Sequence, residues 1–327
     1  MSILVSEVGP RDGLQSIRRT MPTEAKIRWI RALAAAGLRE IEVGSFVNPK
    51  KLPQMADAAE LVRAALEIPG LTVLALAPNL RGAQAAQAAG ARKITMPVSA
   101  SNSHSLANIG VTTDRAIEQV GEVIAWRDTL PESARLEIEI GISTAFGCTI
   151  EGAVSEDRVI DVAIRLARQG ADSVGLSDGV GYANPAQVKR LFTRLHAELG
   201  DKAGGAHLHN TRGQGLANVV AALDVGVTTF DASQGGIGGC PYSPGATGNI
   251  VTEDLVWMLE AMGLDTGVDL EKLAEARRIL EEGLPGESIY GYLPDVGTEK
   301  GFHYANGRLA PEGTGKVHHG KDHEAAA

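Results

Sequence analysis

His207 and His209, in the segment GAHLHN, form the strongest local pattern in the sequence for chemistry. Side chains at positions i and i+2 of a β-strand project to the same face, so the two imidazoles converge if this segment is extended. Such a pair can bind a metal ion, or it can be a hydrogen-bonded pair in a core. Further ligands brought to the same place would favour the metal site.

Arg11 and Asp12 stand side by side in the segment SEVGPRDGLQS, between two glycines and a proline. The carboxylate can hold a metal ion, and the guanidinium can stabilise an oxyanion that forms on a substrate. A structural ion pair is the alternative. The glycines and the proline favour the first interpretation, because they shape the backbone for close approach of a ligand.

Cys148 and Cys240 are too few for a disulfide framework, so each is either a packed thiol or a reactive one. Cys240 lies in GGIGGCPYSPGATGN, where the glycines and prolines predict a mobile or tightly turned loop. A thiol on such a loop can be an acid or base on a lid. It can equally be a small side chain packed under a turn, and the spacing leaves both readings open.

The elements that must position these residues are short β-branched runs that alternate with segments of helical period, such as TEAKIRWIRALAAAG. Their number and spacing match a (β/α)8 TIM barrel, with extra helices after the last strand. A doubly wound sheet is the competitor, but no GxGxxG opens a helix after the first run. The eight predicted strands are 3–9, 39–45, 72–78, 92–98, 136–143, 172–178, 205–210 and 228–233.

We expect one catalytic domain over residues 1–296, made of the barrel and a C-terminal helical extension. Residues 297–327 are expected to form a flexible tail, because they are rich in Gly, Lys and His. The tail histidines His318, His319 and His323 are weak candidates for metal binding.

Active sites of TIM barrels form at the carboxyl ends of the strands, and the polar candidates fall there. Two imidazoles, one carboxylate and one amide oxygen make a mixed nitrogen and oxygen set with open positions. We therefore predict a divalent ion, Mg²⁺ or Mn²⁺, held by Asp12, His207, His209 and Asn249. The other polar residues at strand ends are Arg11 after the first strand, Glu42 in the second, Asp178 in the sixth and Cys240 after the eighth.

The charge and the composition of the chain argue against two classes of binding partner. The formal net charge is -9 and no basic run is present, which argues against nucleic acid. No stretch approaches the ~20 apolar residues that cross a bilayer. The apolar run at the N-terminus is too short for a signal peptide and has the wrong flanking residues. We expect a cytoplasmic protein without a membrane partner.

The motifs EVGPRDGLQ, IEVGSFVNPKKLPQMAD, HLHN with GQGLANV, and GGCPYSPGATGNIVTEDLVWML resemble those of the 3-hydroxy-3-methylglutaryl-CoA lyase family. The resemblance covers about residues 3 to 295, and the joint occurrence of these motifs in this order is highly specific. It implies a metal-dependent lyase that cleaves an acyl-CoA to acetyl-CoA and acetoacetate by retro-Claisen chemistry. It also implies a homodimer.

The resemblance also implies a role for each site residue. Asp12, His207, His209 and Asn249 would bind the divalent ion, and Arg11 would bind the acyl carbonyl and the developing enolate. The family's catalytic cysteine matches Cys240, which would protonate the enolate carbon. Three further positions match supporting residues: Asp178 near the reacting centre, Glu42 beside Arg11, and Gln15 in the substrate pocket.

Two departures from the family pattern leave the substrate open. Asn210 and Arg212 follow His209 where family members carry an aspartate and no arginine, and the segment SASNSHSLANIG after the fourth strand also differs. Citramalyl-CoA or a longer 3-alkyl glutaryl-CoA is therefore an alternative substrate. A condensing synthase is a weaker alternative, since Leu14 stands where such synthases tend to carry Glu and no long regulatory domain follows residue 295. A non-catalytic metal-binding barrel is the weakest.

Overall fold

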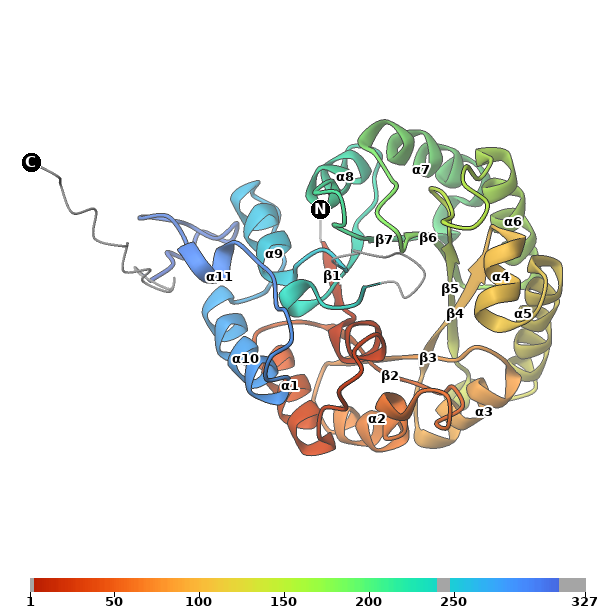
Figure 1. Cartoon of the computed structure of the whole chain (residues 1–327), viewed down its shortest axis with the longest axis horizontal. Helices are drawn as coiled ribbons and strands as arrows, with labels where there is room; N and C mark the ends of the chain where they lie inside the picture. Colours follow the sequence, from red (N-terminus) through yellow and green to blue (C-terminus); the bar gives the residue numbers. More distant parts are fainter. Residues whose placement is uncertain (1–2, 240–247, 312–327) are drawn as a thin grey trace, which may run out of the picture.

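A computed structural model describes residues 3–239 and 248–311. Within them, eight parallel strands form a closed barrel in the order β1 to β8, and helices surround it (Figure 1). The predicted (β/α)8 barrel is confirmed, and each predicted strand run overlaps one observed strand. The strands are β1 Leu4–Glu7, β2 Glu40–Ser45, β3 Thr72–Leu76, β4 Lys93–Ser99, β5 Glu137–Ser143, β6 Ser173–Asp178, β7 Ala203–Leu208 and β8 Thr229–Ala232.

The helices follow the strands in turn, and those after β8 complete the ring. In Figure 1, α9 and α10 lie beside β1 and α1, and the backbone N–H of Asp269 donates to Ala36 at the end of α1 at 2.7 Å. The helices are α1 Thr23–Ala35, α2 Ala58–Leu66, α3 Leu80–Ala89, α4 Asn102–Ile109, α5 Thr113–Asp128, α6 Glu156–Gln169, α7 Pro185–Leu199, α8 Gly215–Leu223, α9 Thr252–Ala261, α10 Leu270–Gly283 and α11 Leu293–Val296. None of the described helices is both long and apolar enough to cross a bilayer.

The main core lies between the strands and the helices. In β5, Ile138, Ile140 and Ile142 are fully buried in this layer, while Glu139 and Gly141 alternate with them and line the lumen. This is the period-2 alternation of a strand with two different faces. TIM barrels usually fill the lumen with bulky branched side chains. Here glycines and short polar side chains line it, so a cavity extends down the barrel.

A charge cluster around the largely buried Lys93 lies low in this lumen. The Lys93 ammonium lies 2.8 Å from Glu40, 2.9 Å from Glu139 and 3.5 Å from Glu137. Burial raises the pKa of Glu139 to about 7, although Lys93 opposes the rise. The cluster shows how charged residues are tolerated on these strands, because each carboxylate in it is paired with the same cation.

Polar side chains on barrel strands can face the lumen or its mouth, but Glu7 in β1 points outward, where it accepts bonds from Gly9, Gln234 and Thr252. The tail expected from Gly297 does not begin there, because Phe302 and Tyr304 are buried and the Tyr304 hydroxyl accepts a bond from the Leu270 backbone at 3.0 Å. Its histidines, His318, His319 and His323, lie outside the described residues.

Candidate active site

The loop after β1 carries Arg11 and Asp12 on a single π-helical turn, Gly9–Gly13. The carbonyl of Val8 accepts the backbone N–H groups of Arg11 and Asp12 at 3.1 and 2.7 Å, which fixes the turn. The flanking glycines are explained by packing rather than by ligand approach. A Cβ on Gly9 would lie 2.6 Å from the Glu7 carboxylate, and one on Gly13 would lie 2.6 Å from Ile237.

Arg11 is buried between two carboxylates. Its Nε donates to Oε2 of Glu42 at 2.5 Å, and its Nη1 donates to Oδ1 of Asp12 at 2.6 Å. The predicted closeness of Arg11, Asp12 and Glu42 is confirmed. The structural ion pair between Arg11 and Asp12, which was the alternative interpretation, is also present. It holds the guanidinium at the mouth of the cavity.

The two histidines converge as predicted. His207 Nε2 lies 3.1 Å from His209 Nε2, and ligand atoms of Asp12, His207 and His209 all lie within 4.8 Å of one another. The Nδ1 atom of His207 lies 3.0 Å from Oδ2 of Asp231 in the neighbouring strand. Two ring nitrogens that face each other beside a carboxylate make a donor set that suits a divalent ion.

Asn249 joins this group through the backbone. It forms an antiparallel bridge with His209, which brings the chain after β8 back to the end of β7. Its Nδ2 donates to Oδ2 of Asp12 at 2.8 Å, while its Oδ1 is buried without a hydrogen-bond partner among the described residues. The oxygen is the atom that would bind a cation, and a half-turn of the amide exchanges oxygen and nitrogen.

Gly238 lies against the candidate metal ligands Asn249 and Asp12. A Cβ at this position would lie 2.4 Å from Nδ2 of Asn249 and 3.0 Å from Oδ2 of Asp12, and its φ of +111° already favours glycine. A side chain there would therefore fill the space between the candidate ligands. The unpartnered Asn249 oxygen, the facing imidazoles and this glycine fit a divalent ion held by Asp12, His207, His209 and Asn249.

The electrostatics of the site keep Asp12 and His209 in the form that binds a cation. Burial opposes the charged form of Asp12, but Arg11 and the two histidines outweigh it and lower the pKa of Asp12 to about 2. Burial and the neighbouring His207 lower the pKa of His209 to about 3. Burial also opposes protonation of His207, but the hydrogen bond with Asp231 raises its pKa. Asp12 is therefore ionised and His209 neutral near pH 7.

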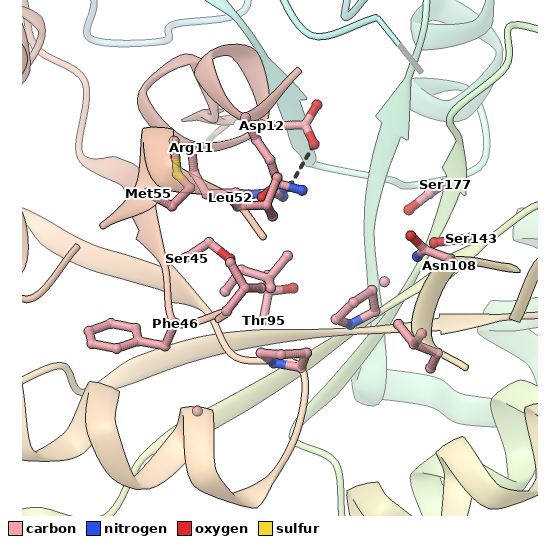
Figure 2. A pocket seen from close by; sticks show the side chains of 18 of the residues that line it. Arg11, Asp12, Ser45, Phe46, Leu52, Met55, Thr95, Asn108, Ser143 and Ser177 are labelled. Carbon is pink, nitrogen blue, oxygen red and sulfur yellow. Dashed lines mark hydrogen bonds and ion pairs between the residues drawn. The ribbon is translucent and has the colours of Figure 1, made fainter. Parts of the chain in front are cut away.

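A cavity of about 1440 Å³ connects these residues with the barrel lumen. Figure 2 shows Arg11 and Asp12 on one side of it and Asn108, Ser143 and Ser177 on the other. Gln15, predicted to support the pocket, lines the cavity, and its Oε1 is buried without a partner among the described residues. The mouth also carries the basic side chains of Lys50, Lys51 and Arg81.

Asp178 is not brought into the group. Its carboxylate accepts the backbone N–H groups of Tyr182 and Ala183 at 2.8 and 2.9 Å, so it fixes the turn after β6. Burial raises its pKa, although these bonds oppose the rise. Asp178 shares the outward face of β6 with Val174 and Leu176, although its carboxylate still interacts electrostatically with His207. Its place near the reacting centre stays a prediction.

Cys240, predicted as the catalytic acid, lies outside the described residues. The departures after His209 are turned away from the candidate ligands. Oδ1 of Asn210 accepts the Gly215 backbone N–H at 3.0 Å. Arg212 donates to the carbonyls of Val180 and Gly181 at 3.2 and 3.0 Å and stacks over the Tyr182 ring. The Arg212 guanidinium therefore contacts the loop after β6 and not the candidate ligands.

Asp231 is the residue of this group that the sequence analysis did not assign to the site. The signal was present, because Asp231 alternates with the apolar Phe230 and Ala232 in β8 and so faces the lumen. Its pairing with His207 depends on the register between β7 and β8, in which the two residues are partners.

A closed parallel barrel with a carboxylate, two imidazoles and a buried arginine at the carboxyl ends of its strands defines a barrel enzyme with a candidate divalent-metal site. The HMGL-like family profile matches residues 2–280. The chain belongs to this family, as its motifs predicted.

Individual relatives cover most of the chain. It is 40% identical over 273 residues to the mitochondrial hydroxymethylglutaryl-CoA lyase of Gallus gallus, which spans 84% of this chain and 90% of that protein. It is 41% identical over 280 residues to the hydroxymethylglutaryl-CoA lyase of Bacillus subtilis, which spans 86% and 92%.

Solved structures agree over similar lengths. The structure of the Bacillus subtilis HMG-CoA lyase superposes with a TM-score of 0.83 at 40% identity, covering 89% of this chain and 96% of that one. An Acinetobacter baumannii HMG-CoA lyase in complex with coenzyme A and 3-methylmalate gives a TM-score of 0.85 at 37% identity, covering 92% and 97%.

Proposed function

We propose that this chain is a carbon–carbon lyase that cleaves 3-hydroxy-3-methylglutaryl-CoA to acetyl-CoA and acetoacetate. The observation that carries the proposal is the convergence of Asp12, His207 and His209 beside Arg11 at one cavity, in a member of the HMGL-like family. Relatives from a bird and a bacterium that span most of the chain bear the name of this activity.

In this proposal Asp12, His207, His209 and Asn249 hold a divalent ion, Mg²⁺ or Mn²⁺. When bound, such an ion supplies Lewis acidity that lowers the pKa of a substrate hydroxyl. The donor set supports a six-coordinate ion, since it leaves open positions for substrate oxygens. The ionised Asp12 and the neutral His209 offer lone pairs without first losing a proton.

Arg11 binds the thioester carbonyl and stabilises the enolate that forms when the C2–C3 bond breaks. Its Nε and Nη1 are bonded to Glu42 and Asp12, so we assign Nη2 to the substrate oxygen. A guanidinium fixed in advance by two carboxylates needs little reorganisation during the reaction, which is the basis of oxyanion stabilisation. Glu42 thus supports the pocket by holding Arg11, and Gln15 supports it by lining the cavity.

Two proton transfers accompany the cleavage. A base removes the proton of the substrate hydroxyl, and the Cys240 thiol donates a proton to the enolate carbon.

An acyl-CoA fits the shape and charge of the site. The cavity is far larger than a six-carbon acyl group needs, and Lys50, Lys51 and Arg81 give its mouth a positive charge that suits the phosphates of coenzyme A. The related Acinetobacter baumannii lyase was solved with coenzyme A bound.

A related 3-hydroxy acyl-CoA, such as citramalyl-CoA or a longer 3-alkyl glutaryl-CoA, is the second candidate substrate. The lumen has space for a longer 3-alkyl group, because Gly141 lines it and a Cβ there would meet only Oγ of Ser177 at 3.3 Å. Arg212 is turned toward the loop after β6, so it does not argue for a change of substrate.

Incubation of the Mn²⁺-loaded chain with 3-hydroxy-3-methylglutaryl-CoA and with citramalyl-CoA, followed by measurement of acetyl-CoA, tests the proposal. We expect acetyl-CoA from the first substrate, and acetoacetate in equal amount. Consumption of acetyl-CoA would identify a synthase instead, and no product from either substrate would refute the lyase.

A homodimer and a cytoplasmic location belong to the same proposal, and light scattering tests the dimer.

A further inference from the structure

We propose that Asp231 is a positioning residue that holds His207 in the tautomer and orientation needed for metal binding. The inference rests on the metal site of the proposed function, but not on the lyase reaction. Asp231 lies on β8 and His207 on β7, and the register of these strands makes the two residues direct partners.

The geometry is that of a carboxylate supporting an imidazole. Oδ2 of Asp231 lies 3.0 Å from Nδ1 of His207, and both side chains are largely buried in the lumen, with exposed fractions of 29% and 14%. A carboxylate accepts the Nδ1–H proton, which leaves the lone pair of Nε2 for a ligand. That Nε2 atom is the one that faces His209 and belongs to the candidate metal group.

The two histidines are held by different means. His209 has no such support, because its Nδ1 is buried without a hydrogen-bond partner among the described residues. Its backbone is instead tied to Asn249 through the bridge between the end of β7 and the chain after β8. His207 sits inside a strand and depends on its side-chain contact with Asp231. The carboxylate therefore controls one imidazole of the pair.

Asp231 also adds a negative charge to a lumen that already contains Arg11, Glu42 and Glu139, each close enough to feel its charge. A general attraction for cations would come from any of these carboxylates. A positioning role is specific to the residue in contact with Nδ1. Glu139 provides the matched control, since it contributes a carboxylate to the same lumen and pairs with Lys93 instead of a histidine.

The experiment compares Mn²⁺ affinity, read from the paramagnetic resonance signal of the free ion, in the full chain and three variants. We expect Asp231→Ala to weaken binding by about 10- to 100-fold, the usual effect of losing such a support. Asp231→Asn should lose less, because its amide oxygen still accepts the Nδ1–H bond. Glu139→Gln should change affinity by less than about threefold, since a single charge acting without contact is weakly felt.

A second readout follows the imidazole itself. Nitrogen-15 spectra of the metal-free chain should show His207 protonated at Nδ1, and a mixture of tautomers in Asp231→Ala. A purely structural role would leave this tautomer unchanged in any variant that folds. If Asp231→Ala does not fold, Asp231→Asn, which keeps the shape of the side chain, carries the test.

Unchanged affinity in both Asp231 variants, or an equal loss in Glu139→Gln, would overturn the inference. A chain that binds no Mn²⁺ would overturn it as well. Because no substrate is present in these measurements, the expected pattern in a chain that forms no acetyl-CoA would sustain the inference while refuting the proposed reaction.

Discussion

The Nε atom of Arg11 lies 2.5 Å from Oε2 of Glu42, and both side chains are buried where β1 and β2 end. This ion pair ties the loop that carries two site residues to the neighbouring strand. The other oxygen of Glu42, Oε1, is buried without a hydrogen-bond partner among the described residues. The contact with Arg11 is therefore the main compensation for burying this carboxylate.

Replacing Glu42 by glutamine should release Arg11 from its position. We expect the free energy of unfolding to fall by about 1–3 kcal/mol, because the buried guanidinium keeps only Asp12 as a charged partner. Displacing the guanidinium by even 1 Å should lower kcat by about 10²-fold. Urea unfolding and steady-state kinetics measure the two effects. Glu118→Gln, in an exposed pair with Arg115, is the control and should cost less than about 1 kcal/mol. Wild-type kcat in Glu42→Gln would contradict this role.

The sequence predicted the eight strands, because β-branched runs at regular spacing leave few alternatives to a barrel. It also predicted the convergence of Asp12, His207 and His209, since carboxyl ends of parallel strands meet at one end of the barrel. Two polar residues could have been placed correctly from the alternation of side chains along their strands, which the spacing of polar residues in the sequence does not show. Glu7 shares the outward face of β1 with the buried Val5, and Asp178 shares that of β6 with Leu176.

Other features depend on tertiary contacts that no local pattern encodes. The bridge between His209 and Asn249 forms because the chain after β8 returns to β7, across a long loop. The partnership of Asp231 with His207 follows from the strand register. Gly9 and Gly13 look like ligand-binding glycines in the sequence, but their nearest neighbours are Glu7 and Ile237 of the chain itself.

Two lumen glycines should respond differently to the same substitution. A Cβ on Gly175 would lie 2.5 Å from the backbone oxygen of Gly205, which has no room to move, whereas one on Gly141 would meet only Oγ of Ser177 at 3.3 Å. Gly175→Ala should therefore lower the free energy of unfolding by about 1–3 kcal/mol, as overpacking does. Gly141→Ala should remain close to the wild type. Chemical unfolding of both variants makes the comparison, and equal stability would contradict the close strand packing.

Metal binding should stabilise the chain. At a free Mn²⁺ concentration of 100 times Kd, the free energy of unfolding should rise by about 2.7 kcal/mol, and chelation should reverse the gain. His209→Ala removes one of the candidate ligands and should abolish most of the increase. His196→Ala is the control, because His196 lines a small cavity at the opposite end of the barrel. Thermal unfolding with and without Mn²⁺ reads the effect. A gain that survives in His209→Ala would place the ion elsewhere.

Glu7 should make stability depend on pH. Burial raises the pKa of Glu7 to about 8, even though Thr252 and the backbone N–H groups of Gln234 and Gly9 oppose the rise. The folded chain thus holds a proton that an unfolded glutamate, with a pKa near 4.5, releases. The stabilisation is complete below about pH 4.5 and is lost as the pH rises through about 8, by at most about 1.36 kcal/mol per pH unit.

Glu7→Gln tests this directly, because glutamine has the shape and hydrogen bonding of the protonated acid. Its oxygen can accept the N–H groups of Gly9 and Gln234, and its amide can donate to the Thr252 hydroxyl, which lies 2.7 Å from Oε2 of Glu7. The variant should match the wild type in acid and exceed it in alkali, when the two unfolding free energies are compared across this range. A constant loss at every pH would mean that Glu7 is buried as a carboxylate, held ionised by the three donors around it.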